Sequence, residues 1–301
     1  MPDTARSKRK TIRLLTVGNS FAVNATRYLG DLAKVAGHRL VLGTCNIGGC
    51  SLERHWTKAE AFEKNPRAAR RDKVQYADNM SLKERLRSGK WDVVTIQQYS
   101  RIAHDPAGYR PYARNLRDYI LTHAPEAEVV FIETWAYRCD TPDMPPSPDA
   151  ASRMMTRKEM ARRVRRAYAL LGRELGIRGI PVGDAFDLVE SDPKWRFRPD
   201  RSHDLAKARP GELPDQARSL HRGYFWRTDK EGKDIRLMDG RHASDAGQYL
   251  GACVLFEFLF GEDVRRNPFT PVELGVAFAR RLRRAAHDAV AARRSPPTRS
   301  R

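Results

Sequence analysis

Ser20, Asp239 and His242 are the residues whose types and spacing are suited to acyl transfer. Ser20 follows the apolar run 14–17 and a Gly-Asn pair, at the point where a helix-like pattern begins. A serine hydroxyl becomes a useful nucleophile when a base takes its proton, and histidine suits that role near neutral pH. A carboxylate three residues before the histidine can reach back to Nδ1 and hold the ring in one tautomer. The pattern predicts a triad of nucleophile Ser20, base His242 and orienting acid Asp239.

Each of these residues also has a purely structural interpretation. Serine is a preferred N-cap residue, so Ser20 could serve only to begin a helix. Asp239 and His242 by themselves are compatible with a solvated turn. The presence of both features in one chain favours the catalytic interpretation.

Five short apolar runs bounded by turn residues predict buried parallel strands. They cover residues 12–17, 39–45, 92–97, 128–134 and 179–183. Helical patterns cover residues 21–36, 77–88, 107–123, 154–175, 245–260 and 272–293, with Ser244 as the expected N-cap of the fifth. This alternation predicts an α/β protein, a three-layer α/β/α sandwich around a five-stranded parallel sheet in flavodoxin-like order 2-1-3-4-5.

We expect a single domain over residues 11–293 with disordered basic tails at 1–10 and 294–301. The proline-rich stretch 137–150 predicts a loop after the fourth strand. Residues 190–238 mix aromatic and charged residues, which indicates an insertion that serves as a lid or binding loop rather than a second domain.

The carboxyl ends of the predicted strands bring several further polar groups to the edge where Ser20 lies. A tetrahedral intermediate needs hydrogen-bond donors where its oxyanion develops. The candidates are the backbone N–H of Ser20, a glycine N–H at Gly48 or Gly49, and a side-chain amide from Gln97 or Gln98.

Aromatic and histidine side chains near this edge are candidates for the pocket. Trp56, Tyr99 and Trp135 are predicted to contact substrate, although a core role fits each of them equally well. His55 and His104 are expected in loops, where they shape the rim.

Four blocks of the sequence together resemble an SGNH (GDSL-type) hydrolase. They are GNSF after the first strand, GGCSLERHW after the second, IQQYS at the third and DGRHAS near the end. The blocks occur in the family's order over about residues 12–262, and they most resemble the branch with a GNSF first block and a Gln-Gln third block. The resemblance implies the same three triad roles and a glycine oxyanion donor at Gly48 or Gly49.

The chain departs from the family pattern at two places. Asn19 stands where the family commonly has Asp, and the third block lacks the Asn whose amide usually completes the oxyanion hole. A Gln-containing third block is known in carbohydrate-esterase relatives, so Gln97 resembles the substitute, with Gln98 as the alternative.

The composition of the chain argues against a membrane-spanning protein and against a metal- or cofactor-dependent one. With 301 residues, 41% of them hydrophobic, the chain can bury a sizeable core, and no apolar run approaches the ~20 residues of a membrane span. The N-terminus lacks an apolar signal region and a cleavage site, which predicts a cytoplasmic protein. Cys45 and Cys50 have no second Cys or His pair at metal-binding spacing, so we predict neither a metal site nor a cofactor.

The net charge of +19 raises the question of a polyanionic partner. The basic residues are spread over nearly every predicted helix, and no nucleic-acid-binding motif with interleaved aromatics is present. We therefore expect no nucleic-acid partner, and assign no anion-binding role to Arg54 or Arg241 among so many arginines.

These observations predict a serine esterase acting on a small-molecule or carbohydrate ester. O-acetyl groups on a carbohydrate are the first candidate, by family analogy. Two alternatives remain: an acyltransferase using the same triad, and a polyanion- or nucleic-acid-binding protein on a hydrolase-like scaffold. A dinucleotide-binding domain is disfavoured because the first loop reads GNSFAV rather than G-x-G-x-x-G.

Overall fold

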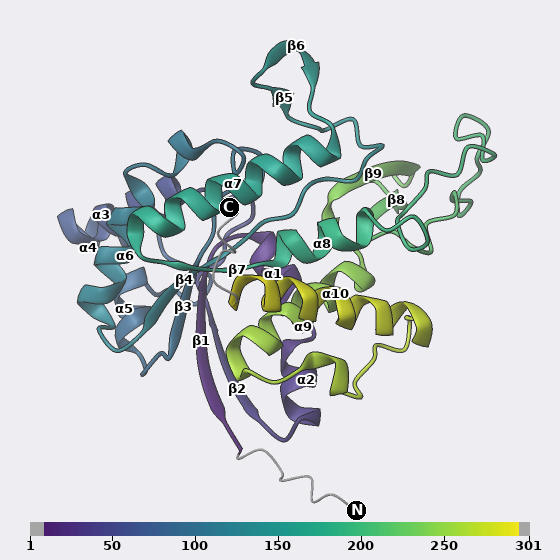
Figure 1. The fold of residues 1–301 in the computed structure, drawn as a ribbon. Helices are drawn as coiled ribbons and strands as arrows, with labels where there is room; N and C mark the ends of the chain where they lie inside the picture. Colours follow the sequence, from purple (N-terminus) through teal and green to yellow (C-terminus); the bar gives the residue numbers. More distant parts are fainter. Residues whose placement is uncertain (1–8, 295–301) are drawn as a thin grey trace, which may run out of the picture.

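A sheet of five parallel strands forms the centre of the molecule. The computed structural model describes residues 9–294. The strands are β1 (Thr11–Val17), β2 (Arg39–Thr44), β3 (Val93–Ile96), β4 (Glu128–Ile132) and β7 (Arg178–Ile180), in the order β2-β1-β3-β4-β7 (Figure 1). The predicted α/β class, five-stranded parallel sheet and flavodoxin-like order 2-1-3-4-5 are confirmed.

The inner strands are apolar because helices cover them on both faces. All four residues of β3 are buried, and β4 is buried from Val129 onward. A strand covered on both faces reads as a continuous apolar run rather than as an alternating pattern. This is why these strands could be recognised in the sequence.

Helices form the two outer layers (Figure 1). One side carries α3 (Leu52–Lys64), α4 (Pro66–Arg71), α5 (Leu82–Arg87) and α6 (Tyr112–His123). The other side carries α1 (Ser20–Thr26), α2 (Leu29–Val35), α9 (Asp245–Phe260) and α10 (Val276–Arg294). The remaining helical segments are α7 (Arg157–Leu175), α8 (Val182–Glu190) and the short 3-10 turns η1 (Pro106–Tyr109) and η2 (Val264–Arg266).

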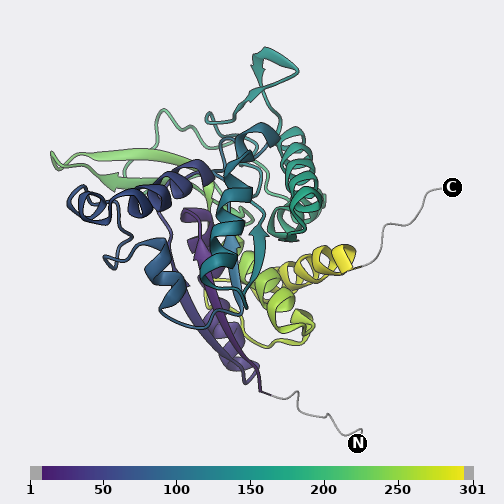
Figure 2. The same ribbon diagram turned by 90° about the vertical axis from the view of Figure 1, so that its left-hand side faces the viewer.

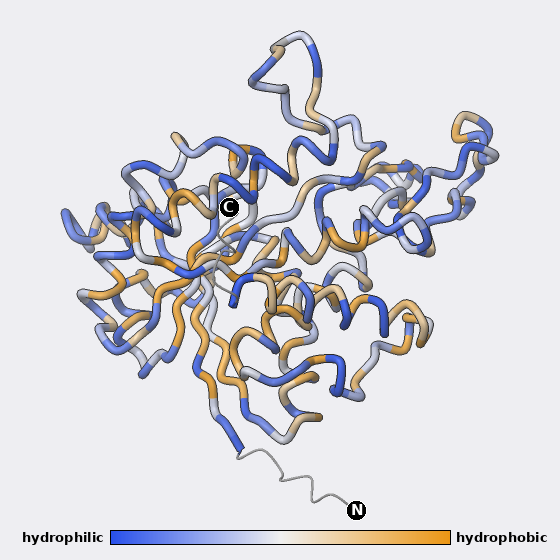
Figure 3. Tube along the Cα trace, viewed as in Figure 1, coloured by the Kyte–Doolittle hydropathy of each residue, from blue (hydrophilic) through white to orange (hydrophobic). Residues whose placement is uncertain are grey.

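Helix α9 lies in the interior and is apolar around most of its circumference. It packs against α1, α2, α8 and α10, and the hydrophobic colours of Figure 3 gather in the central strands and the inner helices. A helix that is buried on all sides needs apolar residues on all sides. Its predicted range and its N-cap are confirmed, since Ser244 Oγ accepts a hydrogen bond from Gly247 N at 3.3 Å.

Two antiparallel hairpins extend from the end of the molecule toward which the parallel strands run (Figure 2). One consists of β5 (Pro146–Ser147) and β6 (Ala150–Met154), and the other of β8 (His221–Thr228) and β9 (Asp234–Ala243). The first overlaps the predicted loop 137–150, and the second begins within the predicted insertion 190–238. Neither hairpin was predicted as strands.

Other differences concern the helices. The predicted helix 21–36 is two helices, α1 and α2, and α3, α4 and α8 were not predicted. Helix α3 buries Leu52, His55, Ala59 and Phe62. A histidine at one of the four inward positions interrupts the apolar stripe, so the helical period was hidden.

The ends of the chain are described only in part. The predicted tails span 1–10 and 294–301, of which 1–8 and 295–301 lie outside the described residues. Within the described part, Lys10 donates a hydrogen bond to the carbonyl of Phe260 at 2.5 Å, and Arg294 ends α10. Among residues 9–294, every helix is too short or too polar to cross a bilayer.

Gly247→Ala should destabilise the protein, because α9 approaches the chain before β8 very closely at this position. A Cβ at Gly247 would lie 2.1 Å from the carbonyl oxygen of Leu220 and 3.0 Å from Ala243 Cβ. Overpacking of this kind costs about 1–3 kcal/mol of unfolding free energy.

Gly30→Ala in α2 is the matched control, since a Cβ there meets nothing within 4 Å. It should leave stability unchanged or raise it by about 0.5–1 kcal/mol. Urea unfolding of both variants measures the difference, and equal unfolding free energies would contradict the packing argument.

Candidate active site

Ser20 occupies a sharp corner between β1 and α1, and it is free of the capping role. The N-cap of α1 is Asn19, whose Oδ1 accepts a hydrogen bond from Phe21 N at 3.0 Å. The capping interpretation of Ser20 is therefore wrong. The Ser20 hydroxyl is available for a different partner.

That partner is His242, at the end of β9. The distance from Ser20 Oγ to His242 Nε2 is 2.8 Å, and that from His242 Nδ1 to Asp239 Oδ2 is 2.7 Å. With Nδ1–H donating to the carboxylate, Nε2 is the free acceptor that faces the serine hydroxyl. The alcohol, imidazole and carboxylate thus form one hydrogen-bonded chain.

Asp239 also closes the turn that carries His242. Its Oδ1 accepts hydrogen bonds from the backbone N–H groups of Arg241 at 3.1 Å and His242 at 3.0 Å. Partial burial acts to raise the pKa of Asp239, but the hydrogen bonds from the His242 ring and from these two amides outweigh it. The net effect holds the pKa of this carboxyl well below its usual range, so Asp239 is ionised at neutral pH.

Neighbouring segments hold the turn from the other side. Arg138 N donates to the carbonyl of Gly240 at 2.8 Å, and Trp135 Nε1 donates to the carbonyl of Arg241 at 2.9 Å. The segment after β4 therefore positions the backbone between Asp239 and His242.

Asn24 links α1, the helix that begins at Ser20, to the same turn. It was not among the predicted site residues. Its Oδ1 accepts a hydrogen bond from Ala243 N at 3.0 Å. Asn24 lies four residues after Ser20, so both side chains project from one face of α1. The four-residue spacing between Ser20 and Asn24 was the feature of the sequence from which Asn24 could have been predicted.

Two predicted substrate contacts are corrected by the structure. Trp135 has no exposed surface, because its ring is stacked between those of Phe21 and Phe186. The distances between ring centroids are 4.2 Å to Phe21 and 4.6 Å to Phe186. It supports the turn instead. Trp56 lies on α3, where its ring packs edge-on against that of Tyr119, with 6.0 Å between the ring centroids.

A pocket of about 320 Å³ opens over Ser20 and His242. Gly48 and Gly49 from the loop after β2 line it, together with the predicted contact Tyr99. Ser20 N–H is at the first position of a helix, where no intrahelical acceptor exists. Gly49 has a φ of +62°, a conformation that favours glycine. Ser20 and the two glycines therefore border the same space.

The structure places Gln97 and Gln98 behind this pocket rather than in it. Both side chains are fully buried, and neither is among the described residues that line the pocket. Gln97 Oε1 accepts from Ala22 N at 3.1 Å, while Gln98 Nε2 donates to the carbonyl of Gly108 at 2.7 Å. The expectation that one of these amides faces the oxyanion is corrected: Gln97 holds the first turn of α1, and Gln98 holds the 3-10 turn η1.

Asn19 connects the three loops of the site. Besides capping α1, its Nδ2 donates to the carbonyls of Cys50 at 3.0 Å and Gln98 at 3.4 Å. The side chain is almost fully buried. The Asn19 amide thus ties the corner to the loops after β2 and β3.

The remaining candidates are distributed around the site. Arg241 lines the pocket, with its Nε 3.5 Å from Asp143 Oδ2. Arg54 is exposed on α3, and His104 is partly buried outside the pocket lining. His55 was expected in a loop at the rim but is fully buried in α3.

The cysteines take no part in the pocket. Cys45 and Cys50 are free thiols and are buried, which raises the pKa of Cys45 to about 12 and that of Cys50 to about 11. Neither is a thiolate at neutral pH.

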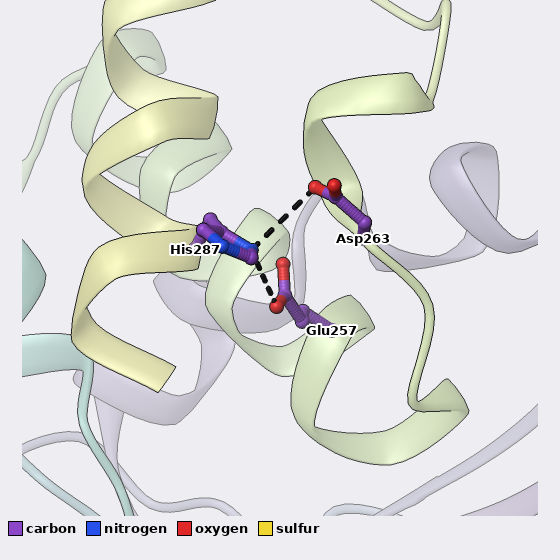
Figure 4. A group of neighbouring side chains, drawn as sticks. All are labelled: Glu257, Asp263 and His287. Atoms are coloured by element: carbon purple, nitrogen blue, oxygen red, sulfur yellow. Dashed lines mark hydrogen bonds and ion pairs between the residues drawn. The ribbon is translucent and has the colours of Figure 1, made fainter. Parts of the chain in front are cut away.

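Glu257, Asp263 and His287 form the one cluster of metal-type ligands found within residues 9–294 (Figure 4). His287 Nδ1 lies 2.9 Å from Glu257 Oε1 and 3.5 Å from Asp263 Oδ1. The carboxylates already accept other donors, Val264 N on Glu257 and the Arg265 guanidinium on Asp263. The cluster joins α9, η2 and α10 and lies outside the pocket lining, so we assign it a structural role.

Comparisons with known proteins agree on the fold. The family model described as a domain of unknown function, DUF4886, matches residues 13–145. A DUF4886 family protein from Bacteroides uniformis has a similar structure, with a TM-score of 0.69 at 23% identity, covering 93% of this chain and 95% of that one. This similarity supports the α/β fold over nearly the whole chain.

Two further solved structures are similar at lower scores. A protein from Slackia heliotrinireducens, proposed to be an SGNH hydrolase, has a TM-score of 0.45 at 20% identity, covering 82% of this chain and 98% of that one. A protein from Parabacteroides merdae, proposed to be a GDSL-like lipase, has a TM-score of 0.43 at 15% identity, with coverages of 84% and 97%. No curated protein matches.

Acidification should remove the stabilising contribution of Asp239. Its folded-state pKa lies below the usual value of 3.8. A group with a depressed folded-state pKa contributes stability that is fully present above its unfolded pKa and is lost as pH falls through the folded value. We therefore expect the difference in unfolding free energy between wild type and Asp239→Asn to shrink between about pH 4 and about pH 2. Urea unfolding over this range measures it; a difference that grows on acidification would refute the assignment.

Proposed function

We propose that this protein is a serine hydrolase that cleaves esters of small acyl groups through an acyl–Ser20 intermediate. The observation that carries the proposal is the continuous hydrogen-bonded chain from Ser20 Oγ through His242 to Asp239, with distances of 2.8 and 2.7 Å. The chain meets the substrate pocket at the serine end.

In the acylation step, Ser20 Oγ attacks the ester carbonyl carbon while His242 Nε2 takes the hydroxyl proton. The carbonyl π pair moves to oxygen and forms a tetrahedral oxyanion. Asp239 stabilises the imidazolium ion that results and keeps the ring oriented. When the intermediate collapses, the C–O bond to the alcohol breaks and His242 returns the proton to the leaving oxygen.

Backbone N–H groups supply the oxyanion hole in this mechanism. Ser20 N–H stands at the N-terminus of α1, and Gly48 and Gly49 border the pocket from the opposite loop. Donors aimed at the developing charge contribute about 3–4 kcal/mol each in acyl-transfer enzymes. The buried side chains of Gln97 and Gln98 act indirectly, Gln97 by holding the first turn of α1 and Gln98 by holding η1.

Water is the acyl acceptor that the site favours. The side chain of His242 is 35% exposed, so solvent reaches the base that must activate the second nucleophile. An acyltransferase needs a pocket that excludes water from the acyl-enzyme. His242 therefore deprotonates a water molecule, which attacks the acyl carbon and releases Ser20 and a carboxylic acid.

The pocket favours short acyl groups. Its volume is about 320 Å³, and small residues, Gly48, Gly49 and Ser100, form part of its lining. O-acetyl esters, including those on carbohydrates, are the substrates we propose first.

The polyanion-binding alternative gains no support from a specific feature. Many arginines pair with carboxylates, such as Arg178 with Glu128 at 2.6 Å and Arg293 with Glu133 at 2.9 Å. A guanidinium group that is held by a carboxylate is less available to bind a phosphate group.

Ser20→Ala and His242→Ala should each lower kcat for p-nitrophenyl acetate by about four to six orders of magnitude. The double variant should be no worse than the single ones, because the two residues act as a unit, and Asp239→Asn should cost less. Steady-state kinetics of the purified variants measures this.

Ser81→Ala is a suitable control. Ser81 caps α5 in a capping box, so the substitution should lower stability by about 1 kcal/mol and leave kcat unchanged. Substantial turnover by Ser20→Ala would refute the proposed nucleophile.

A fluorophosphonate probe should label Ser20 alone among the serines. The reaction needs a serine whose proton is removed by a base, and among described residues Ser20 is the serine hydrogen-bonded to a histidine ring. Peptide mapping identifies the modified residue. Labelling at another serine, or equal labelling of His242→Ala, would contradict the mechanism.

A further inference from the structure

His55 connects the helix after the second strand to the nucleophile corner. The side chain projects from α3 into the interior and is fully buried. Its Nε2 lies 3.0 Å from the carbonyl oxygen of Gly18, and its Nδ1 lies 2.8 Å from the hydroxyl of Tyr76. Both ring nitrogens therefore have partners, and one partner is two residues before Ser20.

The hydrogen-bond partners of the His55 ring determine its tautomer. A carbonyl oxygen only accepts, so Nε2 must carry the hydrogen in its bond to Gly18. Burial lowers the pKa of His55 to about 4, with nearby Lys58 and Arg54 acting in the same direction, so the ring is neutral at pH 7. Nδ1 is consequently an acceptor, and Tyr76 donates to it. Burial also raises the pKa of Tyr76 well above its usual value, which keeps the hydroxyl protonated.

The Gly18 carbonyl already has another donor. Ile47 N donates to it at 3.0 Å, and Ile47 directly precedes Gly48 and Gly49. The bond from His55 is therefore not needed to satisfy a buried carbonyl. It adds a second constraint at the point where the Ser20 corner meets the loop of the proposed oxyanion donors.

We propose that His55 is a positioning residue for the acyl-transfer reaction. Held by Tyr76 in the Nε2–H tautomer, it fixes the Gly18 carbonyl and thereby the spacing between Ser20 and the N–H groups of Gly48 and Gly49. This inference rests on the proposed hydrolase function. It assigns a catalytic consequence to a side chain that does not touch the pocket.

A misplacement of about 1 Å at a reacting centre costs about a hundredfold in rate, so the role is measurable. Because the oxyanion forms after substrate binds, a displaced donor raises the barrier of the chemical step more than it weakens binding. Loss of the His55 bond should therefore lower kcat and leave KM nearly unchanged. If His55 only filled the core, its substitution would instead lower the free energy of unfolding and the number of folded molecules.

His38 provides a control within the same chain. It is also a buried histidine, and its Nδ1 accepts a hydrogen bond from Lys10 N at 3.2 Å. Its Nε2 lies 2.9 Å from Glu262 Oε1. Because His38 directly precedes β2, it lies at the opposite end of the parallel sheet from Ser20, which follows β1. Replacing it removes a similar side chain away from the candidate active site.

The experiment compares His55→Leu, His55→Gln, Tyr76→Phe and His38→Leu with wild type. Burst-phase titration counts active sites, so kcat is expressed per functional enzyme, and thermal unfolding reports stability. We expect His55→Leu to lose about tenfold to a hundredfold in kcat with KM changed less than about threefold. His55→Gln should recover most of kcat because its amide can donate to Gly18. Tyr76→Phe should lose severalfold in kcat, and His38→Leu should lose stability but not kcat.

Nitrogen-15 NMR of the wild-type histidines tests the inference without any variant. Neutral His55 with hydrogen on Nε2 at pH 7 is expected. A ring protonated on Nδ1, or charged, would overturn the proposal even if His55→Leu fails to fold.

The kinetic outcomes separate this inference from the proposed function. If His55→Leu and Tyr76→Phe both keep wild-type kcat per active site while wild type shows Ser20-dependent turnover, the positioning role is wrong and the hydrolase proposal stands. If wild type shows no Ser20-dependent turnover or labelling, both proposals fall.

Discussion

The hydrogen bond between Ser20 and His242 is the constraint on which the rest of the structure depends. It joins residues 222 positions apart in the sequence, at a distance of 2.8 Å. A bond of this kind is maintained only if both backbones are held by their own surroundings, since a single hydrogen bond contributes about 1 kcal/mol. The fold supplies that support from two directions.

The first direction is the packing of α1 against α9. The two helices lie side by side, and Asn24 of α1 binds the backbone at Ala243, next to His242. Helix α9 then begins immediately, capped by Ser244. His242 therefore lies between the hydrogen bond from Ala243 to Asn24 of α1 and the start of the buried helix α9, which leaves its backbone little freedom.

The second direction is the segment after β4. Trp135 and Arg138 donate hydrogen bonds to backbone carbonyls of the turn between Asp239 and His242. Trp135 is itself stacked between two phenylalanines. Aromatic stacking and backbone hydrogen bonds thus replace the regular sheet pairing that ends at this edge.

The sequence was sufficient to predict the sheet, because buried parallel strands leave continuous apolar runs and right-handed crossovers leave few strand orders. The carboxyl-end rule for parallel strands placed Ser20 at one edge of the sheet, and the D-x-x-H spacing associated Asp239 and His242 with it. The structure carries Asp239 and His242 on the antiparallel hairpin β8–β9, which was not predicted. The orientation of individual side chains could not be predicted. Trp135 and one of Gln97 and Gln98 were expected to face the pocket, but all three are buried. The direction that a side chain takes at a strand end depends on tertiary contacts that composition does not reveal.

The amide of Asn19 has a consequence for how this corner tolerates chemical change. One of its atoms accepts from Phe21, and the other donates to two carbonyl oxygens, those of Cys50 and Gln98. An aspartate would still accept from Phe21 but would direct a negatively charged oxygen at both carbonyls. Deamidation at this one position, a change of a single atom, would thus turn an attraction shared by three loops into repulsion.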